Sequence, residues 1–185
     1  MSLQQFLQGD GNFANRNDRG ETDWLEVGEL DLGGQLWIGD PCTVSRSFGF
    51  VIRLPGGMYS VEGRGLFDDE DGFPRVSRLR IVNSDARASR LGPKVGVCGT
   101  DTAMVALCDI EEVERVANEV GVEELRQRAI DAGQDGCGAL DVYARGEMLR
   151  LVFSSTGYGD GTFPVLALLD GPRTVGVEIE FIEFL

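Results

Sequence analysis

Residues 148–185 read MLRLVFSSTGYGDGTFPVLALLDGPRTVGVEIEFIEFL and decide the fold class. Apolar runs of strand length alternate here with the turn signals Gly-Asp-Gly and Gly-Pro. Asp160-Gly161 is typical of a tight type I′ hairpin, because both central residues of that turn need positive φ. The closing run VGVEIEF, at 175–181, alternates apolar and polar side chains as a half-solvated antiparallel strand does. The stretch therefore predicts an antiparallel β-meander.

Similar strand patterns fill most of the preceding chain. They are bounded by Gly, Pro and Asp and recur at a spacing of about 8–12 residues, which favours a sandwich or a barrel. One helical pattern interrupts them, with Asp109 as a candidate N-cap, Gly121 as a break and Gly133 as a stop. We expect an α+β fold that is mainly antiparallel β, a β-sandwich or open barrel with one helical segment at about 109–132. The predicted strands before the final meander lie at 24–30, 35–38, 48–54, 58–67, 75–82, 94–97, 102–107 and 140–143.

The domain organisation follows from length and composition. The 185 residues are enough for one domain with a core of its own. Residues 1–22 are polar, rich in Asn, Asp, Gln and Gly, and lack apolar periodicity. We therefore predict a flexible N-terminal arm at 1–22, followed by a single β-rich domain at 23–185.

Histidine is absent, and this absence removes most catalytic chemistry. Ser-His-Asp triads, Cys-His dyads, histidine metal sites and histidine proton shuttles cannot be built. The four cysteines, Cys42, Cys98, Cys108 and Cys137, form no C-x-x-C pair, so free buried thiols are expected. The chain begins without a signal-peptide pattern and has no apolar run of membrane-spanning length. We expect a cytoplasmic protein without membrane contact, without a cofactor and without an assignable catalytic residue.

The net charge of −14 and the pI near 4.3 are the main indication of a partner. Such a charge argues against nucleic-acid binding, which depends on neutralising phosphates, and favours a basic partner or cations. The bases gather between residues 75 and 94, where six of them face a single acid, Asp85. Arg75, Arg78 and Arg80 therefore either form a patch that contacts a partner or pair internally with acidic neighbours. The sequence leaves both interpretations open.

Four pieces of the chain carry a resemblance to a known family. They are FSSTGYGDGTFPV at 153–165, Asp40-Pro41, LPGGMYSV at 54–61, and VGVCGTDTAM at 95–104 with Cys108-Asp109. Kept in order over most of residues 36–185, they resemble a bacterial family of unknown function whose signature is a C-terminal G-D-G-S/T-Y/F-P-V hairpin. Cys98 stands where that family has an acid. The resemblance implies a compact, mainly β, cytoplasmic bacterial domain, and it carries over no catalytic residues because none is established for the family.

Three functions remain open. The first is a non-enzymatic binding module, acidic and of the immunity or inhibitor kind, that binds a basic protein. The alternative is a carboxylate-based site for a divalent cation or a small polar ligand, with hydrolysis as its activity. Its candidate ligand-binding residues are four aspartates at strand ends in the family-like blocks and a tyrosine beside one of them, namely Asp40, Asp101, Asp109, Asp160 and Tyr158. A third, structural role would use an exposed C-terminal strand for edge-to-edge pairing in a dimer.

Overall fold

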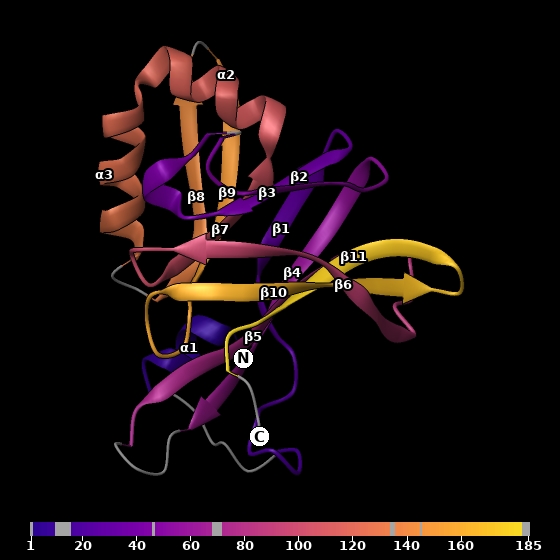
Figure 1. Ribbon diagram of the computed structural model, residues 1–185. Helices are drawn as coiled ribbons and strands as arrows, with labels where there is room; N and C mark the ends of the chain where they lie inside the picture. The colour runs from indigo at the N-terminus through magenta and orange to yellow at the C-terminus, as the bar shows by residue number, and fades with distance from the viewer. Residues whose placement is uncertain are drawn as a thin grey trace.

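The computed structural model describes residues 2–9, 16–45, 47–67, 72–133, 136–144 and 146–182. Within these ranges the chain forms two antiparallel sheets that pack against each other, and a pair of helices covers one of them (Figure 1). The prediction of an α+β, mainly antiparallel β fold of the sandwich or open-barrel type is confirmed.

The six-stranded sheet has the order β1-β4-β5-β11-β10-β6, with β1 (Leu25–Leu32), β4 (Gly57–Phe67), β5 (Pro74–Asn83), β11 (Arg173–Glu180), β10 (Gly161–Asp170) and β6 (Arg90–Thr100). The five-stranded sheet has the order β3-β2-β7-β9-β8, with β3 (Phe50–Arg53), β2 (Gln35–Gly39), β7 (Met104–Asp109), β9 (Glu147–Ser155) and β8 (Cys137–Ala144). The helices are α1 (Leu3–Leu7), α2 (Ile110–Val120) and α3 (Val122–Gly133), with a short 3₁₀ turn η1 (Pro41–Thr43). Gly121 separates α2 from α3, which confirms the predicted helical segment and its break.

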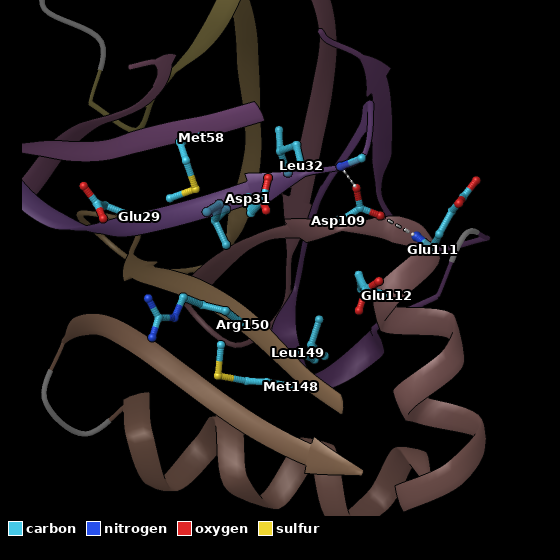
Figure 2. A pocket seen from close by; sticks show the side chains of 12 residues that line it. Glu29, Asp31, Leu32, Met58, Asp109, Glu111, Glu112, Met148, Leu149 and Arg150 are labelled. Carbon is cyan, nitrogen blue, oxygen red and sulfur yellow. Dashed lines mark hydrogen bonds between the residues drawn. The ribbon is translucent and has the colours of Figure 1, made fainter. Parts of the chain in front are cut away.

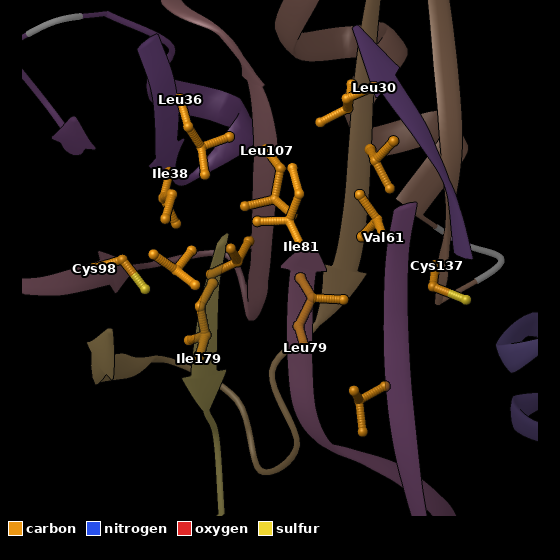
Figure 3. Close-up of a cluster of buried hydrophobic side chains, with 14 of the residues drawn as sticks. Leu30, Leu36, Ile38, Val61, Leu79, Ile81, Cys98, Leu107, Cys137 and Ile179 are labelled. Carbon is orange, nitrogen blue, oxygen red and sulfur yellow. The ribbon is translucent and has the colours of Figure 1, made fainter. Parts of the chain in front are cut away.

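The larger core lies between the two sheets (Figure 3). The five-stranded sheet contributes alternate residues of β2 and β7, and the six-stranded sheet contributes alternate residues of β4, β5 and β11. This period of two is what two facing sheets require, because successive side chains of a strand point to opposite faces. The contributing residues include Leu36, Ile38, Val61, Leu79, Ile81, Val105, Leu107, Val177 and Ile179.

A smaller core lies on the opposite face of the five-stranded sheet, beneath α2 and α3 (Figure 1). Trp37 of β2 points into it, as do Ala106 and Cys108 of β7. Ile110 and Leu125 close this core from the two helices. The five-stranded sheet is therefore covered on both faces, and β2 and β7 are buried along nearly all of their length.

The connection between β9 and β10 is not the tight hairpin that the sequence predicts. β9 belongs to the five-stranded sheet and β10 to the six-stranded sheet, so the two strands do not pair. The loop at 156–160 instead carries the chain between sheets, and Gly157 and Gly159 adopt φ angles of 67° and 120° there. The prediction is wrong because an Asp-Gly turn specifies a reversal of direction but not the partner of the next strand. The following turn does form a hairpin, in which β10 pairs antiparallel with β11.

β11 also differs from the exposed, half-solvated strand that its alternation predicts. It lies between β5 and β10, and its polar residue Glu178 is only 4% exposed. Arg78 of β5 pairs with this carboxylate, since its Nη1 donates to Glu178 Oε1 at 2.9 Å. Its Nη2 donates to the neighbouring carboxylate, Glu180 Oε1, at 2.6 Å. Both edges of β11 are already paired, so the hypothesis of a dimer built through this strand is wrong.

A further buried carboxylate belongs to the same network. Glu21 is 1% exposed, and its Oε1 accepts hydrogen bonds from Ser77 Oγ at 2.8 Å and from Arg78 Nε at 3.1 Å. Its Oε2 accepts from Asn17 Nδ2 at 3.0 Å and from Arg64 Nη1 at 3.4 Å. Burial alone would raise the pKa of Glu21, but these hydrogen bonds and the nearby guanidinium groups outweigh it and hold the pKa below its ordinary value of 4.5.

The N-terminal helix α1 packs into the larger core. Leu3 and Phe6 are 0% and 1% exposed and belong to the cluster between the sheets. They fit because β4 has glycine at two positions on the same face. A Cβ atom at Gly63 would lie 2.4 Å from Leu3 Cδ2, and one at Gly65 would lie 2.2 Å from Phe6 Cε1. The two glycines therefore make the space that α1 occupies.

The predicted flexible arm at 1–22 is accordingly wrong for the parts of it that the structure describes. The second part, at 16–22, is tied to β4 as well, because Thr22 N donates to Gly65 O at 2.8 Å and Gly65 N donates to Thr22 Oγ1 at 3.0 Å. The signal that was overlooked is the helical i, i+3, i+4 spacing of Leu3, Phe6 and Leu7, which is short and lies in a polar segment. Residues 1 and 10–15 of the predicted arm lie outside the described residues.

We expect Phe6→Ala to lower the free energy of unfolding by about 3–5 kcal/mol, because it opens a cavity in the larger core. Phe48→Ala is the matched control, since Phe48 is 67% exposed, and it should change the free energy by less than about 0.5 kcal/mol. Urea unfolding measures both. Equal, small effects would show that α1 is not part of the cooperative fold.

Glu21→Gln should change how stability depends on pH. Because the pKa of Glu21 is lower in the folded chain than in the unfolded chain, its carboxylate stabilises the fold fully above about pH 4.5 and loses this effect as the pH falls through the folded value. We expect the native chain to exceed Glu21→Gln in stability at neutral pH and to lose that advantage on acidification. Urea midpoints from about pH 7 down to about pH 3 test this, and parallel curves for the two proteins would contradict it.

Candidate functional site

Two hollows lie at opposite ends of the β2–β7 pair. The two strands run antiparallel, with Leu36 beside Asp109 and Gly39 beside Ala106. We call the hollow at the start of β7 the polar pocket and the one at the end of β7 the acidic groove. Each has a volume of about 600 Å³, which lies within the range of ligand-binding pockets.

The polar pocket contains three of the four predicted aspartates. It is lined by Asp40, Thr43, Phe48, Gly49, Gly99, Thr100, Asp101, Asp160, Gly161 and Thr162. Asp40 is 5% exposed, and its Oδ1 accepts a hydrogen bond from Cys42 N at 2.8 Å. Its Oδ2 accepts from Thr100 Oγ1 and from Asp101 N, both at 2.9 Å. Asp40 therefore holds η1 against the turn between β6 and β7, which explains why a carboxylate is placed there.

Asp101 and Asp160 are exposed at the mouth of the same pocket. Asp160 Oδ1 accepts a hydrogen bond from Ala103 N at 2.7 Å, next to the left-handed φ of 56° at Ala103. This bond supports a strained turn. In the described part of the chain, no group of three or more Cys, Asp or Glu is placed to hold a metal ion. Three residues of the predicted divalent-cation site thus share one pocket, but in the described part of the chain they do not form a metal-binding group.

Asp109, the fourth aspartate, is at the other end of β7. Six residues of strand separate it from the polar pocket, which at 3.3 Å per residue is roughly 20 Å. Its Oδ2 accepts from Gly33 N at 2.7 Å and its Oδ1 accepts from Glu111 N at 2.9 Å. Asp109 therefore caps α2, as predicted, and ties the β1–β2 turn to it. The predicted convergence of all four aspartates is wrong.

The acidic groove lies between β1 of one sheet, β9 of the other and the start of α2 (Figure 2). Five carboxylates and one guanidinium border it. Glu29 and Asp31 come from β1, Asp109 ends β7, and Glu111 and Glu112 are in the first turn of α2. The acids of α2 suit the positive end of the helix dipole, and the acids of β1 alternate along an edge strand. Folding brings these two acidic segments together at one opening.

The guanidinium in the groove, Arg150, is already paired with an acid. Arg150 Nε and Nη2 donate to the two carboxylate oxygens of Asp141 at 2.7 and 2.8 Å. The hydrogen bonds from Arg150 lower the pKa of Asp141, and those to Asp141 raise the pKa of Arg150. Asp141 does not line the groove, and Arg150 is the one base among the described residues that line it. The bidentate pair therefore directs part of the positive charge of Arg150 away from the groove acids. The groove consequently favours cationic groups.

Apolar side chains form the rest of the acidic groove. Leu30, Leu32 and Leu149 are buried in its walls, while Met58 and Met148 are 46% and 44% exposed. Methionine side chains are flexible and polarisable, which suits them to contacts with varied apolar surfaces. The groove therefore combines a negative rim with apolar contact area.

The remaining predicted site residues lie apart from the groove lining. Tyr158 is 63% exposed and stacks with Arg75, whose Cζ is 4.5 Å from the ring centroid. Arg80 pairs with Glu62 at 2.6 Å and stacks on Trp24. Arg78 is 8% exposed and holds the buried carboxylates described above. The interpretation of these arginines as a partner-contact patch is wrong for Arg78, and internal pairing is confirmed for Arg78 and Arg80.

Three of the thiols are poorly suited to act as nucleophiles. Cys42, Cys98, Cys108 and Cys137 are all buried and none is in a disulfide, as predicted. Burial raises the pKa of the Cys98 thiol to about 12 and raises that of Cys108 well above its ordinary value. Burial, together with the nearby charge of Asp40, raises the pKa of Cys42. A reactive cysteine needs a stabilised thiolate, and the environments of Cys42, Cys98 and Cys108 oppose one.

Sequence analysis missed the acidic groove. Glu29, Asp31, Glu111 and Glu112 stand out neither by motif nor by spacing, because each pair fits its own local structure. The available signal was the alternation of acids on a strand that precedes a turn, together with the acid-rich first turn of a helix. Their proximity depends on the pairing of β2 with β7, which a single sequence does not reveal.

Comparison with known proteins leaves the chain without an assigned family, since no family description, curated protein or solved structure matches it. The resemblance to the bacterial family with the G-D-G hairpin signature stays a prediction. Among the described helices, none has the length and apolar character needed to cross a membrane.

Asp40→Ala should destabilise the fold by about 2–4 kcal/mol, because it leaves the donors of Cys42, Thr100 and Asp101 without their acceptor. Asp101→Ala is the matched control and should cost less than about 0.5 kcal/mol, since its side chain is exposed. Thermal and urea unfolding check both values. A harmless Asp40→Ala would show that the carboxylate is not structural and would restore its candidacy as a ligand.

Proposed function

We propose that the protein is a non-enzymatic binding module for a basic, partly apolar segment of another protein, and that the acidic groove is its binding site. The observation that carries the proposal is the composition of this groove. Five carboxylates surround an opening of about 600 Å³ whose walls are leucine and methionine side chains. A purely solvated acidic surface would lack the apolar walls, and a purely apolar cleft would lack the charge.

Two further features support a basic partner. The net charge of −14 attracts cationic proteins over long range and speeds their association at low salt. The buried network also uses arginines internally, which leaves exposed carboxylates such as Glu29, Asp31 and Glu111 without compensation by those bases. An immunity-like or inhibitor-like role is consistent with this geometry and belongs to the proposal. A cytoplasmic location also belongs to the proposal, and the absence of a disulfide among Cys42, Cys98, Cys108 and Cys137 supports it.

The alternative, a site for a divalent cation or small polar ligand in the polar pocket, has weaker support. The oxygens of Asp40 are engaged by three internal donors, and Asp160 supports a turn. A ligand there would have to rely on exposed Asp101 and the remaining oxygen of Asp160. The geometry therefore favours the acidic groove.

Neutralising the groove should weaken the binding of a basic probe. The test variant combines Glu29→Gln, Asp31→Asn and Glu111→Gln, all at exposed positions. The probe is a fluorescein-labelled heptapeptide of alternating lysine and leucine, followed by anisotropy at low ionic strength. Three charges worth about 0.5 kcal/mol each predict a rise in Kd of about tenfold, and added salt should reduce the difference.

The control for net charge combines Asp18→Asn, Asp23→Asn and Asp85→Asn, which are exposed and outside the groove. It changes the total charge by the same amount, so it should raise the Kd by less than about threefold. If the two triple variants weaken binding equally, the attraction is a property of the whole charge and the groove is not the site.

A further inference from the structure

The acidic groove runs along an open backbone edge, and not only beside a patch of side chains. β1 is an edge strand of the six-stranded sheet, paired with β4 on one side. The residues of β1 and its following turn that line the groove are consecutive, from Glu29 to Gly33. Since side chains of a strand alternate between faces, a consecutive run can line one hollow only where the strand presents its edge to it.

This open edge has defined ends. Towards the N-terminus of β1, Glu26 forms a bridge with Ser2 beside α1. Towards the C-terminus, Gly33 N donates to Asp109 Oδ2. Between these two contacts no described strand pairs with β1 on the groove side. The window at 29–32 therefore presents the alternate N–H and C=O groups that do not bond to β4.

The opposite wall does not close this edge. The groove residues Met148, Leu149 and Arg150 belong to β9 and pair there with β8. The pairing of β9 with β7 covers only residues 152–155, so this stretch of β9 also presents an edge to the groove. β1 and β9 do not pair with each other, and a space of about 600 Å³ lies between the open edge of β1 and β9.

The side chains on the two faces of β1 indicate which residue types an added strand would need. Glu29 and Asp31 are exposed and lie on one face, beside Ser60 and Met58 of β4. Leu30 is buried and points to the other face, towards the core between the sheets. In an added strand, residues opposite the acids would share their face and favour Lys or Arg, while the residue opposite Leu30 would be apolar.

We propose that the acidic groove binds its partner by strand addition: an extended segment with alternating basic and apolar residues pairs with β1 at 29–32. This inference rests on the proposed function and names its mode. Main-chain hydrogen bonds supply affinity, and the alternation of charge and apolar contact supplies specificity. A helical segment of the same composition would not reach the backbone groups of β1.

Four fluorescein-labelled heptapeptides test the mode of binding with the native chain. One alternates lysine and leucine, and one has the same composition in a helical period. Two more are N-methylated versions of the alternating peptide. One is methylated at the odd-numbered backbone nitrogens and the other at the even-numbered ones, so each lacks the N–H donors of one strand edge. We expect the helical-period isomer to bind at least about tenfold more weakly, because it cannot satisfy both the acids and the backbone edge. One methylated peptide should lose at least about tenfold, while the other should stay within about threefold of the parent.

Amide hydrogen exchange of the native chain gives a second readout. On binding the unmethylated alternating peptide, exchange should slow at the alternate amides within 29–32 that do not bond to β4. Equal binding of the two methylated peptides without such protection would overturn strand addition. Tighter binding of the helical-period isomer would overturn it as well.

These outcomes are separable from a failure of the proposed function. If the groove variant with Glu29→Gln, Asp31→Asn and Glu111→Gln weakens every peptide more than its charge-matched control does, the groove is the site, whatever the mode. If the two triple variants behave alike with all four peptides, the groove itself is excluded and strand addition is excluded with it.

Discussion

The burial of the β2–β7 pair on both of its faces is the constraint on which the rest of the structure depends. Leu36 and Ile38 point to the other sheet, and Trp37 between them points to the helices. One strand thus positions two cores, and its hydrogen-bonded partner β7 does the same. Polar groups cannot lie along such strands without loss of stability, so the carboxylates gather where the strands end. The polar pocket and the acidic groove lie at the two ends of the β2–β7 pair.

The ionic groups divide into two populations with different physical roles. Around Arg78, carboxylates and guanidinium groups are buried and hydrogen-bonded, and they cover the outer face of the six-stranded sheet. Such a network contributes little through its charges alone, because desolvation offsets much of the attraction, but removing one partner leaves a costly buried charge. At the groove, Glu29 and Asp31 are exposed. Their charge is available to a partner because it is not used in holding the fold.

The sequence predicted the fold class and nearly every element, because period-two alternation and the caps around 109–132 are local properties. It did not predict which strands pair. β9 and β10 look like a hairpin and enter different sheets, and β11 looks half-solvated although Arg78 buries its polar face. For the candidate site, the predicted convergence of four aspartates failed at Asp109, while Asp40, Asp101 and Asp160 line one pocket. The acidic groove joins segments about 80 residues apart through tertiary pairing, and no local rule encodes that distance.

The position of β11 between β5 and β10 has a consequence for how the chain folds as it is synthesised. β5 is complete at residue 83, but its neighbour on that side begins only at residue 173. During the intervening elongation β1, β4 and β5 can pair, whereas β6 gains its neighbour β10 only after residue 161 and the two parts join only when β11 is added. The edge of β5 is open for all of that time, and the contacts that close it have a large separation in sequence. Because an open strand edge favours pairing with other chains, the late addition of β11 is the step of folding most exposed to aggregation.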